Sequence, residues 1–305
     1  MEAKKYVDMT YKELGALDRK RTVFFSSISP LETHGPHLPM GTDIFIAEAL
    51  RDRIIESLKE KHPDLTVVLL PTLAIGSDAI PVGGSVRVRY QAILYVLLDT
   101  GRALAKMGFK YWVLTDNHGG PHHQIAIELA ARKLAKDNFH LIAPFHEVFR
   151  RMVERAPDLE AETGLTMGSC GDVEDSHAGR NETSLMLAAH PEKVREGWEK
   201  VGKGKTPPRK LPFRLLTGAS RLLSAAGARD AAVDFHFLAH GLAWVSDPEM
   251  ETYQGVPGEA SAEAGEAMLR YRAKVAVELL EKAMAGKRVR LKPLGWSIRS
   301  LRNVI

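Results

Sequence analysis

A loop that joins an apolar run to an amphipathic helix constrains this chain more than any other feature. The run at 23–28 has the pattern of a buried strand, and the helix predicted over 43–61 carries apolar residues at helical spacing. The segment between them is rich in Gly and Pro and carries four possible metal ligands: Glu32, His34, His37 and Asp43. Open α/β sheets place their sites in loops at the carboxyl ends of strands. We therefore expect a divalent metal to bind in this loop.

Short apolar runs alternate with helical patterns along the first half of the chain. Further strands are predicted over 65–70, 111–114 and 140–144, and further helices over 90–107, 122–136, 182–189 and 259–285. This order predicts the α/β class, with a mainly parallel sheet covered by helices on both faces.

The chain is long enough for one large domain with additions. We predict a single domain over residues 1–305 with a core at about 10–285. Residues 201–229 are rich in Lys, Gly, Pro and Arg, so they are predicted to form an insertion or a mobile lid. Residues 286–305 form a basic tail.

Composition excludes several classes of protein. Hydrophobic residues make up 45% and charged residues 26%, which is typical of a globular protein rather than a disordered one. The net charge is only +4, and the basic clusters lack interleaved aromatics, so we expect no nucleic-acid partner. The sequence has no apolar run long enough to span a membrane and no apolar secretion signal at its N-terminus. With a single cysteine, Cys170, these features indicate a cytoplasmic protein that contacts no membrane.

Two further loops carry histidine together with a carboxylate. His118 lies in Asp116–Gly120, directly after a predicted strand, and His177 and Glu182 lie in Asp175–Ser184. Mixed ligation by histidine and carboxylate suits Zn²⁺, Mn²⁺ or Fe²⁺ better than Ca²⁺ or Mg²⁺. The set of carboxylates and histidines is large enough for two ions if one carboxylate bridges them.

Each of these residues also has an ordinary structural explanation. Asp43 could cap the helix that it begins. His118 could be a loop histidine that bonds to the backbone, and Glu182 could complement a helix dipole. The metal interpretation is favoured because three separate loops each carry this combination.

Other polar residues are candidates for proton transfer or substrate binding. His177 is predicted to carry a proton to a departing amine, because an imidazole titrates near neutral pH. Ser77 and Ser85 lie in loops on the expected ligand side, as hydrogen-bonding groups or as simple turn residues. An acidic group on the substrate could be recognised by Arg87, Arg89 and Arg180.

These motifs closely resemble those of the creatininase family, the creatinine amidohydrolase-like metal enzymes. The segments that carry the resemblance are Glu32–Asp43, Gly108–Leu114 with His118–Gly120, His177–Ser184 and, more weakly, Gly255–Gly258. The resemblance implies a three-layer α/β sandwich, a small-molecule substrate, one or two divalent ions and a homo-oligomer, often a hexamer. It also implies that Asp43 bridges the ions, with Glu32, His34, His118 and Glu182 as the other ligands. Family members hydrolyse C–N bonds in cyclic amides and formamides, and one branch acts on a peptide. In this chain we expect a metal-bound hydroxide to be the nucleophile. His177 occupies the position of the family's proton-transferring histidine.

The chain departs from the family pattern around these ligands. Asp116 and Pro121 stand where the family usually has asparagines, Ser176 replaces an acid, and Arg180 replaces a commonly acidic residue. We therefore expect an amidohydrolase that acts on a small non-peptide amide, cyclic amide or formamide other than creatinine. The alternative is a catalytically inactive relative that serves as a binding or scaffold subunit.

Overall fold

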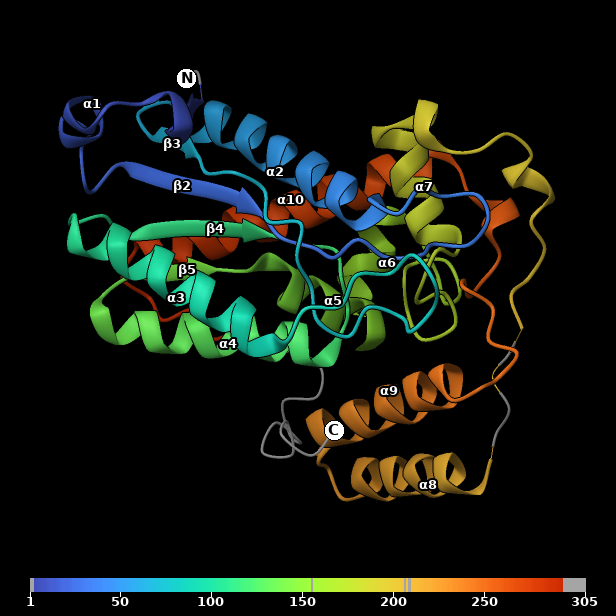
Figure 1. Cartoon of the computed structure of the whole chain (residues 1–305). Helices are drawn as coiled ribbons and strands as arrows, with labels where there is room; N and C mark the ends of the chain where they lie inside the picture. The colour runs from blue at the N-terminus through green and yellow to red at the C-terminus, as the bar shows by residue number, and fades with distance from the viewer. Residues whose placement is uncertain (1–2, 155, 206, 208–209, 293–305) are drawn as a thin grey trace.

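A central sheet of five parallel strands organises the computed structural model, which describes residues 3–154, 156–205, 207 and 210–292. The strands are β1 (Lys4–Lys5), β2 (Thr22–Ser27), β3 (Thr66–Leu69), β4 (Tyr111–Thr115) and β5 (His140–Ile142). Their order across the sheet is β1-β3-β2-β4-β5, and every pairing is parallel. The longest strands, β2 and β4, therefore lie side by side in the middle, and their carboxyl ends meet at one edge (Figure 1).

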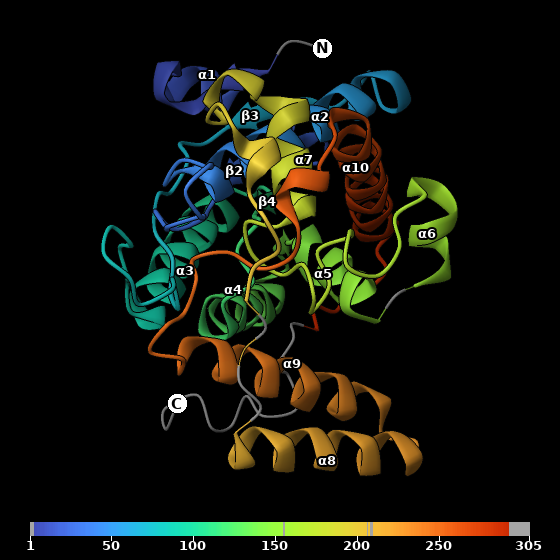
Figure 2. The same cartoon turned by 90° about the vertical axis from the view of Figure 1, so that its right-hand side faces the viewer.

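Both faces of the sheet are buried, as the continuous apolar runs predict. Along β2, Val23 and Phe25 point into one apolar core, whereas Phe24 points into the other. The first core is formed with α2 (Thr42–Lys61), α5 (Pro144–Glu154), α7 (Arg180–Ala189) and α10 (Ala262–Met284). The second is formed with α3 (Tyr90–Lys106) and α4 (Pro121–Leu134). The predicted α/β class is thus confirmed, as a sheet between two helical layers (Figures 1 and 2).

Several elements do not follow from the sequence patterns. The sequence predicted four strands, and the fifth, β1, pairs only two exposed lysines with β3. The helices α1 (Tyr11–Gly15), α5 and α6 (Pro157–Thr163) were also not predicted. Of these, α5 has a marked apolar face. None of these alters the arrangement of the central strands.

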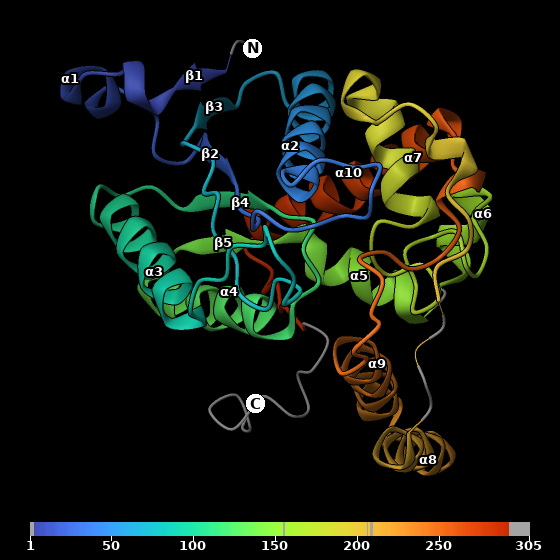
Figure 3. The same cartoon turned by 45° about the vertical axis from the view of Figure 1, so that its right-hand side comes forward.

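The largest difference concerns the segment predicted as an insertion or lid. It contains α8 (Leu211–Ala225), and a second helix, α9 (Arg229–Val245), continues beyond its expected end. The two helices form an antiparallel hairpin that projects from the body of the molecule (Figures 1 and 3). The guanidinium of Arg150 on α5 anchors α9 through Asp230 at 2.8 Å and Asp234 at 3.8 Å.

Most of the predicted basic tail lies outside the described residues, which end at 292. Among the described residues, none of the helices combines the length and the apolar character needed to cross a bilayer.

Candidate metal centre

Strand ends and helix starts bring the predicted ligands together. Glu32 and His34 follow β2, and His118 follows the neighbouring β4. Asp43 lies in the first turn of α2, and Glu182 in the first turn of α7. Because β2 and β4 are adjacent and parallel, their loops emerge at the same edge, where the two helix starts meet them. All five side chains are buried.

The five side chains form two groups that could each hold a metal ion, and Asp43 belongs to both. Glu32, Asp43 and His118 each offer a ligand atom within 4.8 Å of the others, and so do His34, Asp43 and Glu182. The second oxygen of Asp43 lies 3.6 Å from His118 Nδ1, and its first lies 3.5 Å from His34 Nε2. Asp43 would therefore be shared between the two groups if each held a cation.

Hydrogen bonds fix which nitrogen each histidine presents to this cluster. His34 Nδ1 lies 2.9 Å from the Glu32 carbonyl, and His118 Nε2 lies 2.8 Å from the Ser77 carbonyl. A carbonyl can only accept, so these nitrogens carry the protons. His34 Nε2 and His118 Nδ1 are left with lone pairs that face the carboxylates. Backbone bonds of this kind commonly orient metal-bound histidines.

Unsatisfied atoms at the centre of the cluster show that the donor set fits a cation. Glu32 Oε2, His34 Nε2 and Asp43 Oδ2 are buried and make no hydrogen bond within the described residues. His118 Nδ1 lies only 3.0 Å from Glu32 Oε2. Buried acceptors that face one another at such distances are unfavourable unless a proton or a metal ion lies between them.

The electrostatics of the cluster favour positive charge. Burial opposes protonation of His34, but the carboxylates of Asp43 and Glu182 outweigh it and raise the pKa of His34 to about 10. Burial alone would raise the pKa of Asp43, but the two histidines lower that pKa well below its usual range. Asp43 therefore stays ionised, and a divalent cation would replace the protons that the histidines otherwise retain.

A buried asparagine and arginine beneath the cluster were missed by the sequence analysis. Asn117 Nδ2 donates to Asp43 Oδ1 at 2.9 Å and to Glu182 Oε1 at 2.7 Å. Arg272 of α10 donates to Asn117 Oδ1 at 2.7 Å and is 1% exposed. Burial lowers the pKa of Arg272 to about 10, while Glu182 and Asp43 oppose that shift. Asn117 thus aligns two carboxylates, and Arg272 holds the amide in the required orientation.

His177 lies beside the cluster and belongs to neither of the two groups that contain Asp43. Its ring lies 4.2 Å from that of His34, and its Nε2 donates to the Thr33 carbonyl at 2.8 Å. Because Nε2 carries the proton of the neutral ring, Nδ1 is the nitrogen that can gain or lose one. His177 also forms a third group with Glu32 and His34, so it is close enough to act as a ligand.

A cavity of about 380 Å³ opens over the cluster. Glu32, His118 and His177 lie at its base, and Arg87 and His122 also line it. The opposite wall comes from α9, through the apolar residues Phe237, Leu238, Leu242, Trp244 and Val245. The ring of Trp244 lies 5.3 Å from that of His177. The hairpin therefore provides the wall opposite the predicted ligands.

The other predicted residues lie away from this cavity. Ser77 binds the cluster only through its carbonyl, and the Ser85 hydroxyl bonds to the backbone of Thr33 at 3.2 Å. Arg180 pairs with Glu259 at 3.2 Å. None of these three is among the described residues that line the cavity, and neither is Arg89. His37 lies outside the three ligand groups, with Nε2 2.8 Å from the Thr183 hydroxyl.

The departures from the family pattern lie around the ligands, not among them. Asp116 accepts hydrogen bonds from the Ser29 hydroxyl at 2.8 Å and from the His118 amide at 2.9 Å, so it braces the loop. Pro121 is the first residue of α4, a position that needs no amide hydrogen. Ser176 lines the cavity and donates to Gln254. These substitutions leave the donor set complete.

Comparison of the sequence with known proteins finds a family model and several relatives. The model of the creatininase family, described as creatinine amidohydrolase, matches residues 7–280. A mycofactocin precursor peptide peptidase of Mycolicibacterium smegmatis is 26% identical over 202 residues, 66% of this chain and 70% of that protein. One of Mycobacterium ulcerans is 30% identical over 170 residues, 53% of this chain and 56% of that protein. The chain therefore aligns with little more than half of the second relative.

Solved structures share the fold across nearly the whole chain. A manganese creatininase superposes with a TM-score of 0.62 at 20% identity and covers 93% of this chain and 99% of its own. A creatininase variant of the Zn-Zn type superposes with a TM-score of 0.61 at 20% identity, over the same shares. At this level of identity the likeness establishes the fold alone.

Proposed function

Because the chain belongs to the creatininase family of hydrolases, we propose that it is a divalent-metal-dependent amidohydrolase that cleaves a C–N bond. The observation that carries the proposal is the pair of buried groups that share Asp43. Glu32 and His118 would hold one ion with Asp43, and His34 and Glu182 would hold the other. Zn²⁺, Mn²⁺ and Fe²⁺ suit this donor set. A bound ion would polarise the carbonyl and lower the pKa of water.

The residues around the metal ligands would exclude water, transfer a proton and hold the His177 ring in position. The apolar wall of α9 limits the water that reaches a substrate above the ligands. His177 lines the cavity, and its Nε2 donates a hydrogen bond to the Thr33 carbonyl. Its Nδ1 would therefore be the atom that donates a proton to the departing nitrogen. Trp244 packs beside His177 and would hold that ring in place.

The bond cleaved would lie in a small amide, cyclic amide or formamide. A short peptide is the second candidate, and two observations favour it. Relatives that align with this chain are named as precursor peptide peptidases. The cavity also has a broad apolar wall that could receive a hydrophobic side chain.

Metal content and hydrolysis, measured on the same preparation, test the proposal. The protein would be loaded in turn with Zn²⁺, Mn²⁺ and Fe²⁺, and elemental analysis would give the ions per chain. Each loaded form would then be assayed on cyclic amides, N-formyl compounds and short peptides with free or blocked ends. We expect one or two ions per chain and hydrolysis of at least one class. A chain that binds no ion and cleaves nothing would support the alternative of an inactive binding subunit.

A further inference from the structure

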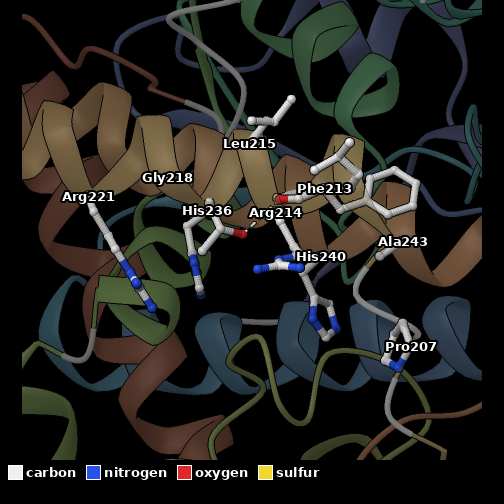
Figure 4. Close-up of a pocket in the computed structure, with 12 residues that line it drawn as sticks. Pro207, Phe213, Arg214, Leu215, Gly218, Arg221, His236, His240 and Ala243 are labelled. Carbon is white, nitrogen blue, oxygen red and sulfur yellow. Dashed lines mark hydrogen bonds between the residues drawn. The ribbon is translucent and has the colours of Figure 1, made fainter.

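A second, larger cavity lies on the other side of α9 from the metal centre. It measures about 640 Å³ and is formed between α8 and α9 (Figure 4). Arg214, Arg221, His236 and His240 line it together with apolar residues, among them Leu211 and Leu215. Among its described lining residues there is no Asp or Glu. We call this cavity the hairpin pocket.

The two arginines lie together on the wall that α8 contributes to the hairpin pocket. They lie seven positions apart on α8, so they share one face of the helix about two turns apart. Figure 4 shows their guanidinium groups extending toward the same space as the rings of His236 and His240. Neither arginine has an ion pair within the described part of the chain, and both are exposed. The acids of α9 do not compensate them, because Asp230 and Asp234 face Arg150 on α5.

The hairpin pocket also has open space beside Gly218 and exposed apolar side chains. Gly218 lies between the two arginines on the same face, and an added Cβ there would meet no atom within 4 Å. Leu211 and Leu215 are 67% and 66% exposed. A ligand with a hydrophobic portion would gain free energy by covering these two side chains.

One residue connects the hairpin pocket to the metal centre. His240 lines both cavities. Its Nε2 lies 3.0 Å from Gln254 Oε1, and the backbone N–H of Gln254 donates to the His177 carbonyl at 2.7 Å. The two cavities therefore adjoin at His240, and a ligand that lies along this residue would place groups in both.

We propose that the hairpin pocket binds the carboxylate of an elongated, partly apolar substrate whose reactive amide lies over the metal ligands. This inference rests on the proposed function. It restricts the substrate class to amides that carry an anionic group remote from the bond that is cleaved. Paired guanidinium groups suit a carboxylate because each can donate two parallel hydrogen bonds.

Binding of two matched probes tests the site without any reaction. Phenylbutyrate and phenylbutanol have similar size and differ in charge, and neither contains a C–N bond. We expect the metal-loaded protein to bind the acid about tenfold more tightly than the alcohol, with a preference that weakens as salt is raised. The double variant Arg214→Ala/Arg221→Ala should lose this preference, and Gly218→Leu should weaken binding of both probes. Arg229→Ala is the matched control, because Arg229 lies on the same hairpin outside the pocket.

The fold should tolerate the double variant, because alanine favours helix and both arginines are exposed. Equal binding of the two probes, binding of neither, or a preference that survives in the double variant would each overturn the site.

Steady-state kinetics would test whether the hairpin pocket binds the substrate. With a carboxylate-bearing substrate from the amide panel, the double variant should raise KM about tenfold and leave kcat unchanged. The neutral amide of the same compound should show no change in either constant. Phenylbutyrate should inhibit competitively; non-competitive inhibition would assign the pocket to a separate anion and overturn its role in substrate binding. A protein that binds phenylbutyrate through the arginines but cleaves nothing would refute the proposed function and leave the anion site in place.

Discussion

The metal cluster and the α8–α9 hairpin border the same cavity but are built in opposite ways. The cluster is fully buried at the meeting of two central strands and two helix starts, and its ligands are held by further hydrogen bonds. The hairpin projects from the body and presents exposed leucines and arginines. Its contacts with α5 include the ion pair of Arg150 with Asp230 and a ring contact between Phe149 and Phe237 at 5.4 Å.

This contrast separates the two requirements of a hydrolytic site. Ligands must hold their geometry closely, and a network buried in the core provides that rigidity. Recognition of a substrate requires a surface that can change without disturbing the ligands, and a peripheral hairpin provides it. Changes in the cluster should therefore abolish metal binding, whereas changes in the hairpin should leave metal binding intact and alter how the substrate is bound and turned over.

Asp43→Ala should have the largest effect, because Asp43 belongs to both ligand groups. We expect loss of bound metal and a fall in activity of about 10³-fold or more, measured by elemental analysis and steady-state kinetics on one preparation. Glu56→Gln is a matched control, since Glu56 is an exposed acid on the same helix. A metal-replete and active Asp43→Ala protein would refute the ligand assignment.

Asn117→Ala tests whether the support beneath the cluster matters. The substitution removes two hydrogen bonds that align Asp43 and Glu182, while all five ligands remain. We expect metal affinity to fall about 10- to 100-fold, measured by competition with a chelator of known affinity. Gln91→Ala removes an exposed amide on α3 and should leave affinity unchanged. Equal affinity in Asn117→Ala and the wild type would show that the ligands need no such alignment.

Trp244→Ala tests the hairpin wall. Removing the indole enlarges the cavity beside His177 and exposes the substrate site to water. We expect KM to rise about tenfold while metal content stays constant. Trp244→Phe should retain most of the affinity, and Leu222→Ala should change nothing, because Leu222 is 74% exposed and lies outside both cavities. Loss of metal in Trp244→Ala would contradict the separation of the two regions.

The same contrast explains how much the sequence could predict. Continuous apolar runs identified β2 and β4, and the motifs that follow them identified the ligands that lie together in the structure. Arg272 was missed because a charged residue in a long amphipathic helix is usually solvated. A signal was present, however, since position 272 falls on the same apolar stripe as Met268, Val275 and Leu279.

The cavity wall could not be found in this way. α9 follows a segment of Lys, Gly and Pro that resembles an open insertion, and its mostly apolar sequence shows no single face. Which of its residues meet the metal centre depends on how the hairpin packs against α5, a contact between residues distant in sequence.

The smallest effect concerns His37, which lies in the ligand loop but outside the ligand groups. Burial, helped by the positive charge of His34, lowers the pKa of His37 to about 4 in the folded chain. The unfolded chain titrates near pH 6.5, so below that pH it binds a proton that the folded chain does not. His37 therefore makes almost no pH-dependent contribution to the free energy of unfolding well above pH 6.5. As pH falls from 6.5 toward 4, this free energy decreases. At pH 5 the loss should be about 1–2 kcal/mol.

Chemical denaturation of metal-free protein between pH 7 and pH 5 would measure this loss. His37→Gln removes the titrating group and keeps a side chain of similar reach for the hydroxyl of Thr183, which lies 2.8 Å from His37 Nε2. The variant should therefore lose less stability than the wild type over this interval, by about 1–2 kcal/mol. Carboxylates elsewhere titrate equally in both proteins, so the difference between them isolates His37. Identical pH dependence in the two proteins would mean that His37 takes up its proton in the folded state, which would place it among the charged residues of the cluster rather than among the residues that support it.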